Sequence, residues 1–158
     1  MDSTAKIYVQ RSLNELKAAK VLFAISNDPK KKQEFQLEEE TTFFSSVISH
    51  SYYAIFYGAK AILHTKKIKT EMPEVHKKTY EAFEEHFVDT GILDTEFLKI
   101  YQKMIVRARE LLQIFKDEKW KRGHFTYQTI PQANKEPADQ SIQNATSFIK
   151  NIKLVLEK

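Results

Sequence analysis

The longest stretch of helical periodicity in the chain runs from Thr42 to Thr65. One set of apolar residues recurs every three or four positions, and a second set extends the apolar surface almost all the way round: Phe44, Ile48, Tyr52, Ile55, Ala59 and Ile62, then Phe43, Val47, Ala54, Ala61 and Leu63. A helix that is apolar on nearly every side is typical of the middle of a bundle, with neighbours on several faces. The pattern therefore predicts a long central helix over residues 42–65.

One narrow polar stripe interrupts the apolar surface of this predicted helix. Its members follow one another at spacings of four, three, four and three: Ser46, His50, Tyr53, Tyr57 and Lys60. Polar groups along a buried helix need hydrogen-bond partners, so the stripe faces a polar crevice, a partner subunit or a ligand. Its length and regularity predict a homodimer in which an isologous contact brings two copies of the stripe together. The alternative is that these are satisfied core or interface groups.

The same periodicity predicts four further helices. They cover about residues 3–25, 73–88, 95–117 and 138–157. Asp2 or Ser3 can cap the first, and Pro73 suits the first position of the third. A polar connection is expected from Pro29 to the central helix, and Gly91 is expected to stop the third helix. The prediction is thus an all-α, antiparallel bundle of about five helices.

Composition agrees with this architecture. The chain has 158 residues, of which 42% are hydrophobic and 29% are charged, so it suits one domain with a substantial core. With only 3 Gly and 4 Pro there are few places to turn, which favours long helices over many short strands. We therefore expect a single helical domain over residues 1–158.

Charge and cysteine content narrow the possible functions. The absence of cysteine excludes a disulfide framework, a thiol nucleophile and a thiolate metal site, and it fits a reducing cytoplasm. The N-terminal segment is amphipathic and charged, unlike a secretory signal peptide, and no apolar run is long enough to span a bilayer. A net charge of +4 is compatible with contact to RNA, DNA or an acidic partner, and equally with ordinary solubility. A cytoplasmic protein without a membrane partner is expected.

Periodicity is lost from Lys119 to about Pro137, where cations alternate with aromatic residues. Four residues stand out as candidates for RNA or nucleotide binding: Trp120, Arg122, His124 and Tyr127. Cations hold phosphates, while flat rings and guanidinium planes stack on unpaired bases. The alternative is that the aromatic residues fasten the loop to the bundle and the cations remain solvated.

Motifs for metal, cofactor or nucleophile chemistry are not found. The 5 histidines share no metal-ligand spacing, and the chain has neither a Gly-rich phosphate loop nor a nucleophile elbow. The sequence therefore predicts no metal and no cofactor.

The segment Ser51-Tyr52-Tyr53-Ala54-Ile55-Phe56-Tyr57-Gly58-Ala59-Lys60-Ala61-Ile62-Leu63 resembles the central helix of a HEPN domain. His76 falls where related small HEPN proteins carry a His before the third helix, and Arg107 or Arg109 resembles their Arg late in the fourth. The segment 125–134, with Ala138 and Ala145, also resembles prokaryotic, chiefly archaeal, members. The resemblance implies a dimeric antiparallel bundle that is commonly encoded beside a minimal nucleotidyltransferase, often as a toxin–antitoxin pair.

Active members of that family are metal-independent endoribonucleases that use an Arg followed, after four to six residues, by a His. No Arg and His of this chain have that spacing. We therefore expect a non-catalytic subunit that binds RNA, a nucleotide or a protein partner, with no catalytic residue. One alternative is an endoribonuclease with a rearranged site built from Arg107 or Arg109 and His124. The other is a purely structural interaction subunit.

Overall fold

The computed structural model describes residues 1–120 and 134–158, and its description of side chains covers residues 1–111 and 134–158. Within these ranges the regular structure is entirely helical, with six α-helices, one π-helical turn and no strand. The elements are α1 (Ser3–Asn27), α2 (Pro29–Glu34), α3 (Phe44–Thr65), α4 (Val75–Phe83), the π-helical turn η1 (Glu84–Val88), α5 (Thr95–Trp120) and α6 (Lys135–Leu156). The predicted all-α fold class is confirmed.

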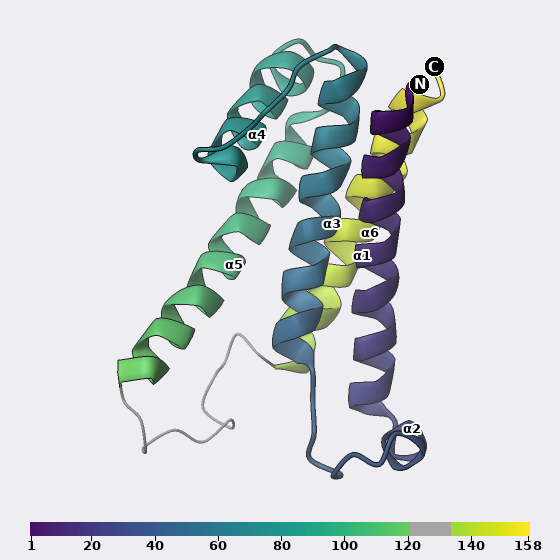
Figure 1. Ribbon diagram of the computed structural model, residues 1–158, viewed down its shortest axis with the longest axis vertical. Helices are drawn as coiled ribbons and strands as arrows, with labels where there is room; N and C mark the ends of the chain where they lie inside the picture. The colour runs from purple at the N-terminus through teal and green to yellow at the C-terminus, as the bar shows by residue number, and fades with distance from the viewer. Residues whose placement is uncertain (121–133) are drawn as a thin grey trace.

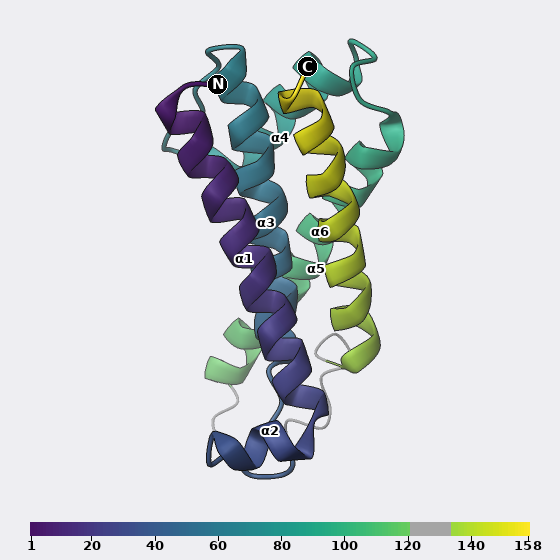
Figure 2. The same ribbon diagram turned by 90° about the vertical axis from the view of Figure 1, so that its right-hand side faces the viewer.

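Helix α3 lies in the middle of the bundle, as its sequence pattern predicts. It packs against α1 and α6 on one side and against α4 and α5 on the other. Helices α1 and α5 run in one direction along the long axis, and α3 and α6 run in the opposite direction (Figures 1 and 2). Twelve of the 22 residues of α3 are buried, which explains why its apolar surface extends almost all the way round.

Large aromatic side chains from several elements fill the core beside α3. Phe148 of α6 lies at the centre of this group, with its ring 5.3 Å from that of Phe83 and 5.8 Å from that of Tyr101. All three side chains are fully buried. Since they come from α4, α5 and α6, they join the two sides of the bundle into one packed unit.

Helices α1 and α3 approach each other closely near the middle of α3. The hydroxyl of Ser12 donates a hydrogen bond to the carbonyl of Ala54 over 2.6 Å. A Cβ added to Gly58 would lie 3.5 Å from Ser12 Oγ and 3.6 Å from Phe148 Cε1. The small side chains at these positions therefore let the two helices pack in direct contact along their length.

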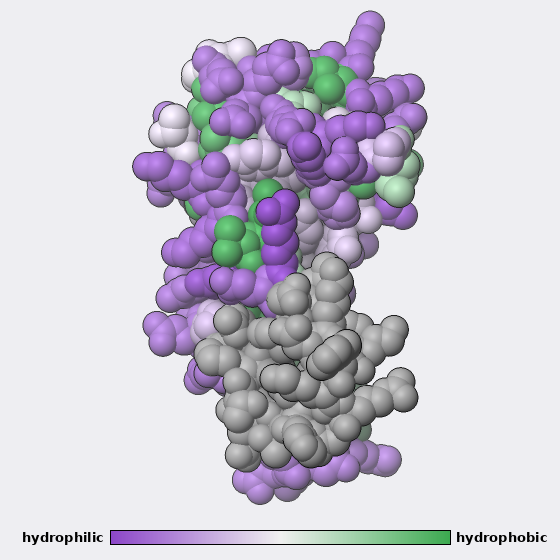
Figure 3. Space-filling model, turned by 90° about the vertical axis from the view of Figure 1, so that its left-hand side faces the viewer, coloured by the Kyte–Doolittle hydropathy of each residue, from purple (hydrophilic) through white to green (hydrophobic). Residues whose placement is uncertain are grey.

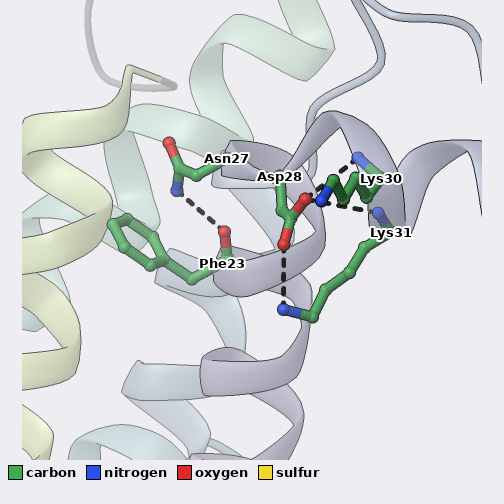
Figure 4. Close-up of polar contacts among 5 residues, drawn as sticks. All are labelled: Phe23, Asn27, Asp28, Lys30 and Lys31. Carbon is green, nitrogen blue, oxygen red and sulfur yellow. Dashed lines mark hydrogen bonds and ion pairs between the residues drawn. The ribbon is translucent and has the colours of Figure 1, made fainter.

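The polar connection expected after the first helix is partly wrong, because residues 29–34 form the short helix α2. The Asp28 side chain accepts hydrogen bonds from the backbone N–H groups of Lys30 at 2.9 Å and Lys31 at 3.4 Å (Figure 4). It also pairs with Lys31 Nζ at 3.1 Å. Asp at the N-cap followed by Pro at the first position is a helix-start signal, so the residues that end α1 also begin α2.

The third predicted helix begins two residues later than expected and does not remain α-helical. Glu74 has a positive φ of 56°, which is not helical, so regular helix begins only at Val75. After Phe83 the chain continues as the π-helical turn η1, closed by the Asp89 N–H bond to the Glu84 carbonyl at 2.9 Å. The predicted stop at Gly91 fits its φ of 75°.

Candidate functional site

A histidine held between two aromatic residues forms the centre of the candidate site. Tyr52 Oη lies 2.8 Å from His76 Nδ1. The imidazole stacks on Phe56, with ring centroids 4.2 Å apart and an interplanar angle of 27°. Tyr52 and Phe56 stand one turn apart on α3, so both side chains face the start of α4, where His76 is the second residue. His76 is exposed although two aromatic neighbours hold its ring in place.

Burial and nearby charges make this pair neutral at physiological pH. Burial raises the pKa of Tyr52 to about 12, with a further rise from neighbouring Tyr53 and an opposing effect from the charge of Arg109. Burial also lowers the pKa of His76 from its ordinary value, and the charge of Lys60 lowers it further. A phenol can donate or accept, so the bond to Tyr52 is compatible with either neutral tautomer of His76. The other ring nitrogen, Nε2, is left to donate or to accept a proton.

Two cations from different helices act on the Tyr52–His76 pair, Lys60 on His76 and Arg109 on Tyr52. Lys60 Nζ is 5.8 Å from the centroid of the Phe56 ring and donates to the Thr70 carbonyl at 3.0 Å. Arg109 is exposed on α5 and lies close enough for its charge to lower the pKa of Tyr52. Cations near an exposed imidazole suit a phosphodiester, because they neutralise its charge while the imidazole donates a hydrogen bond or moves a proton.

An exposed aromatic ring completes the cluster. Tyr53 is 40% exposed, and its ring lies edge-on to that of His76 with centroids 6.0 Å apart. An exposed tyrosine ring is a surface on which an unpaired base can stack. We call Tyr52, Tyr53, Phe56, Lys60, His76 and Arg109 the His76 cluster.

Where its side chains are described, the surface around α4 and α5 is largely hydrophilic. Figure 3 shows this face, on which the hydrophobic side chains that the structure describes form small, separate groups. Such a surface is better suited to a charged ligand than to a continuous apolar contact.

The two arginines that the sequence could not separate have different environments. Arg107 donates to the Pro137 carbonyl at 2.8 Å, to Gln140 Oε1 at 2.6 Å and to Ser141 Oγ at 3.2 Å. These bonds fasten α5 to the start of α6. Of the two candidates, Arg107 thus binds another helix, whereas Arg109 is exposed and its charge lowers the pKa of Tyr52.

Much of the predicted polar stripe of α3 faces α1. His50 Nδ1 lies 2.5 Å from Glu15 Oε2. Tyr57 stacks on Tyr8 with ring centroids 6.3 Å apart, and the Arg11 guanidinium lies 5.3 Å from the Tyr57 centroid. Partners within the chain thus take up these groups, so a second copy is not needed to satisfy them. The homodimer stays a prediction.

The other members of the stripe have varied positions. Ser46 is half-buried near the start of α3, while Tyr53 and Lys60 belong to the His76 cluster. The loop candidates, namely Trp120, Arg122, His124 and Tyr127, have side chains outside the described residues, so their role in binding stays a prediction.

Sequence reasoning pointed to His76 only through a family resemblance and missed its contact with Tyr52. Tyr52 lies on an apolar face, which favours core packing, and its partner is 24 residues away. Two features of the sequence could have indicated the contact. Tyr52 and Phe56 are one turn apart on the central helix, and His76 comes shortly after Pro73, at the start of the next helix. Among the side chains of residues 1–111 and 134–158, no three from His, Cys, Asp or Glu gather as metal ligands would. No helix in these ranges has the length and apolarity needed to cross a membrane.

Comparisons with known proteins give one distant relative. A curated protein of Methanocaldococcus jannaschii named "Putative toxin MJ0605" is 27% identical to this chain over 143 residues, covering 90% of the chain and 81% of that protein. No family model matches the chain, and no solved structure matches it. The chain is thus distantly similar, over most of its length, to a protein named as a toxin.

Proposed function

We propose that this protein is the HEPN-like subunit of a toxin–antitoxin system and that it binds single-stranded RNA at the His76 cluster. Three observations support the proposal. The relative that matches 90% of the chain is named as a toxin. The central helix resembles that of HEPN domains, and its observed place in an all-α bundle is compatible with that resemblance. The cluster itself combines cations, an exposed ring and a histidine.

The main observation behind the proposal is that His76 is exposed although its contacts with Phe56 and Tyr52 fix its orientation. A histidine that served only to fill the core would be buried, whereas this one is exposed, stacked on Phe56 and bonded to Tyr52. Fixing a side chain in one orientation at the surface costs conformational entropy, which a ligand would otherwise have to overcome on binding. Such preorganisation favours recognition of a ligand.

The test measures binding of a short fluorescent single-stranded RNA in EDTA by anisotropy at several salt concentrations. Arg109→Gln should weaken binding and reduce the steepness of the salt dependence by about one counterion. Tyr53→Ala should cost about 1–3 kcal/mol for each base that stacks on the ring. The matched charge control is Lys20→Gln, an exposed cation on α1 away from the cluster. Equal losses for Arg109→Gln and Lys20→Gln would mean that the binding is non-specific.

A second candidate function is metal-independent cleavage of RNA, and the Tyr52–His76 bond favours it. In this reaction His76 Nε2 accepts the proton of a ribose 2′-hydroxyl, whose oxygen then attacks the adjacent phosphorus. The bond to the 5′ oxygen breaks, and a proton donor returns a proton to that oxygen, which yields a 2′,3′-cyclic phosphate and a 5′-hydroxyl. Arg109 would stabilise the charge that develops on the phosphate.

Cleavage and binding are distinguished by product analysis in EDTA. The binding proposal expects intact RNA, whereas the cleavage alternative expects cyclic phosphate ends that His76→Gln abolishes. His86→Gln is the matched control, because His86 lies on the neighbouring η1 turn rather than in the cluster. The rearranged site with His124 makes a separate prediction, namely that His124→Ala abolishes cleavage while His76→Gln does not.

The basic and aromatic residues from Lys119 to Tyr127 are proposed to extend the RNA surface. A Trp120→Ala, Arg122→Ala double substitution should then weaken RNA binding and flatten its salt dependence. Unchanged affinity and salt dependence would assign that segment to packing.

The HEPN resemblance also implies a minimal nucleotidyltransferase as partner and a homodimer as the working state. Co-expression with a nucleotidyltransferase encoded beside this protein should give a complex that survives gel filtration. Light scattering of the protein alone should give twice the 18.5 kDa of one chain. A mass of one chain at tens of micromolar would contradict the dimer but would leave the RNA site untouched.

A further inference from the structure

The hydrogen bond between Tyr52 and His76 has a direction that its length alone does not show. Tyr52 Oη and His76 Nδ1 are 2.8 Å apart, and either atom can be the donor. If the phenol donates, the one ring proton of the neutral imidazole lies on Nε2. If the ring donates, that proton lies on Nδ1 and Nε2 carries none. The direction therefore decides whether His76 offers a donor or an acceptor to a ligand at the surface.

The burial of Tyr52 favours the phenol as the donor. Tyr52 is 8% exposed, and among the residues whose side chains the structure describes, His76 Nδ1 is the hydrogen-bond partner of its hydroxyl. Burial raises the pKa of Tyr52 to about 12, so the hydroxyl keeps its proton at physiological pH. A ring that donated to the phenol would leave this buried proton without an acceptor in the protein, which costs free energy. A phenol that donates to Nδ1 leaves no such unpaired donor.

His50, on the α1 side of α3, shows the opposite arrangement. Its Nδ1 lies 2.5 Å from Glu15 Oε2. A carboxylate accepts hydrogen bonds and does not donate them, so Nδ1 of His50 carries a proton. The partner at Nδ1 thus places the ring proton differently in the two histidines, on Nδ1 beside a carboxylate and on Nε2 beside a buried phenol.

Stacking keeps the His76 ring in the orientation that this bond requires. The Phe56 ring lies 4.2 Å from the imidazole at an interplanar angle of 27°, and the Tyr53 ring lies edge-on at 6.0 Å. A turn of the imidazole about its Cβ–Cγ bond would lose the contact between Nδ1 and Tyr52. Because His76 is exposed, the ring presents one N–H group at a fixed position on the surface.

We propose that Tyr52 is a positioning residue that places the ring proton of neutral His76 on Nε2, which makes this nitrogen a hydrogen-bond donor. The ligand group that it recognises is an anionic oxygen, because an N–H donor is matched by an acceptor that carries charge. The identity of that acceptor as an RNA phosphate oxygen rests on the proposed function. Cleavage with His76 as the base needs the opposite arrangement, since Nε2 must be free of a proton to accept one from a 2′-hydroxyl.

The experiment records nitrogen NMR shifts of the full chain with isotope-labelled histidine, in mildly alkaline buffer and without RNA. Burial lowers the pKa of His76, so the ring is neutral under these conditions. The shift of a ring nitrogen reports whether it carries a proton, and His76→Gln identifies the signals of His76 by their loss. We expect the proton of His76 on Nε2 and a proton of His50 on Nδ1, so that His50 is an internal reference for the other arrangement.

Tyr52→Phe removes the hydroxyl and keeps the ring. The two neutral forms of His76 should then interconvert, and its two nitrogen shifts should move toward each other. Tyr80→Phe is the matched control, because the Tyr80 hydroxyl accepts from Gln102 Nε2 at 2.6 Å and is not the partner of His76. The shifts of His76 should stay the same in this variant. A proton on Nδ1 in the native protein, or His76 shifts that Tyr52→Phe leaves unchanged, overturns the role of Tyr52.

Adding the single-stranded RNA in EDTA distinguishes this role from the proposed function. A phosphate oxygen that accepts from Nε2 should slow the exchange of its proton with water and leave that proton in place. A move of the proton to Nδ1 on binding would overturn the donor role while RNA binding stands. If RNA does not bind, the proposed function fails, whereas a proton on Nε2 that depends on the Tyr52 hydroxyl still supports the positioning role.

Discussion

Similar polar side chains on the two sides of α3 have different environments. Toward α1, His50 meets the carboxylate of Glu15, and Ser12 donates to the backbone of α3. Toward α4 and α5, His76 meets the phenol of Tyr52 and stays exposed. On the α1 side the polar groups are taken up by one another, whereas on the α4–α5 side they are held in position and left accessible. The two histidines therefore differ in their partners and in their accessibility, which is the basis for proposing a ligand on the α4–α5 side.

Helix direction explains this difference. Helix α1 follows α3 closely along its length, so side chains in the seam meet their partners (Figure 2). Helix α5 leans away from α3 toward its C-terminal end (Figure 1). The side of α3 that faces α5 is therefore covered over only part of its length.

The largest effect is expected from overfilling the α1 seam. Ser12→Leu places a bulky side chain where a fully buried serine now lies and removes the bond to Ala54, so the free energy of unfolding should fall by about 1–3 kcal/mol. Urea unfolding measures the change. RNA affinity of the folded variant should stay the same, and a parallel loss of affinity would mean that the two sides are not independent.

Two substitutions that each remove one small group should show whether RNA affinity depends on both sides of α3 or on one. Tyr52→Phe removes one hydroxyl from the His76 cluster and should cost about 0.5–1.5 kcal/mol of stability while weakening RNA binding. Glu15→Gln removes one charge from the α1 side and should cost about 0–1 kcal/mol, because the pair with His50 is partly exposed. RNA affinity should fall only for Tyr52→Phe. Equal affinities for both variants would contradict a ligand role for the Tyr52–His76 pair.

A smaller and opposite effect is expected at Gly58. The added methyl would meet Ser12 and Phe148 only at ordinary contact distances, so Gly58→Ala should fit without displacing either. Replacing a mid-helix glycine should then stabilise the fold by about 0.5–1 kcal/mol. Thermal unfolding provides the measurement, and destabilisation would show that the seam is tighter than these distances indicate.

The smallest effect concerns the pH dependence of stability. Because the pKa of His76 is lowered in the fold, the unfolded chain binds more protons between that lowered pKa and the ordinary value of 6.5. The free energy of unfolding should therefore decline as pH falls below 6.5 and level off below the folded pKa. His76→Gln should remove this part of the decline, and Lys60→Gln should reduce it, because the charge of Lys60 contributes to the lowering.

Periodicity predicted the long helices well and the short elements poorly. Residues 42–65 were expected to be the central helix, and α3 covers Phe44–Thr65. Helix α2 has only 6 residues, too few to show a repeat, although Asp28 and Pro29 carry a start signal. Glu74 has a positive φ, which could not be predicted because glutamate rarely adopts it.

The candidate site was less predictable because its contacts join distant parts of the chain. The local pattern does not pair Tyr52 with His76. The contact depends on the path of the segment between α3 and α4, because this segment determines where α4 begins. Arg107 and Arg109 are two residues apart on one helix, and the sequence offers no reason to prefer either. Only the position of α6 shows that Arg107 is engaged by Gln140 and its neighbours.

The central place of α3 also has a consequence for the order in which the chain folds. Helices α1 and α3 are close in sequence and pack along their length, so closing the loop between them costs little entropy. Helix α6 packs on α3 as well, but it is synthesised after all the other helices described here. During synthesis on the ribosome, we therefore expect the α1–α3 pair to form first. Until α6 packs, the side of α3 that faces α6 is exposed to solvent. The aromatic core around Phe148 closes only when α6 emerges.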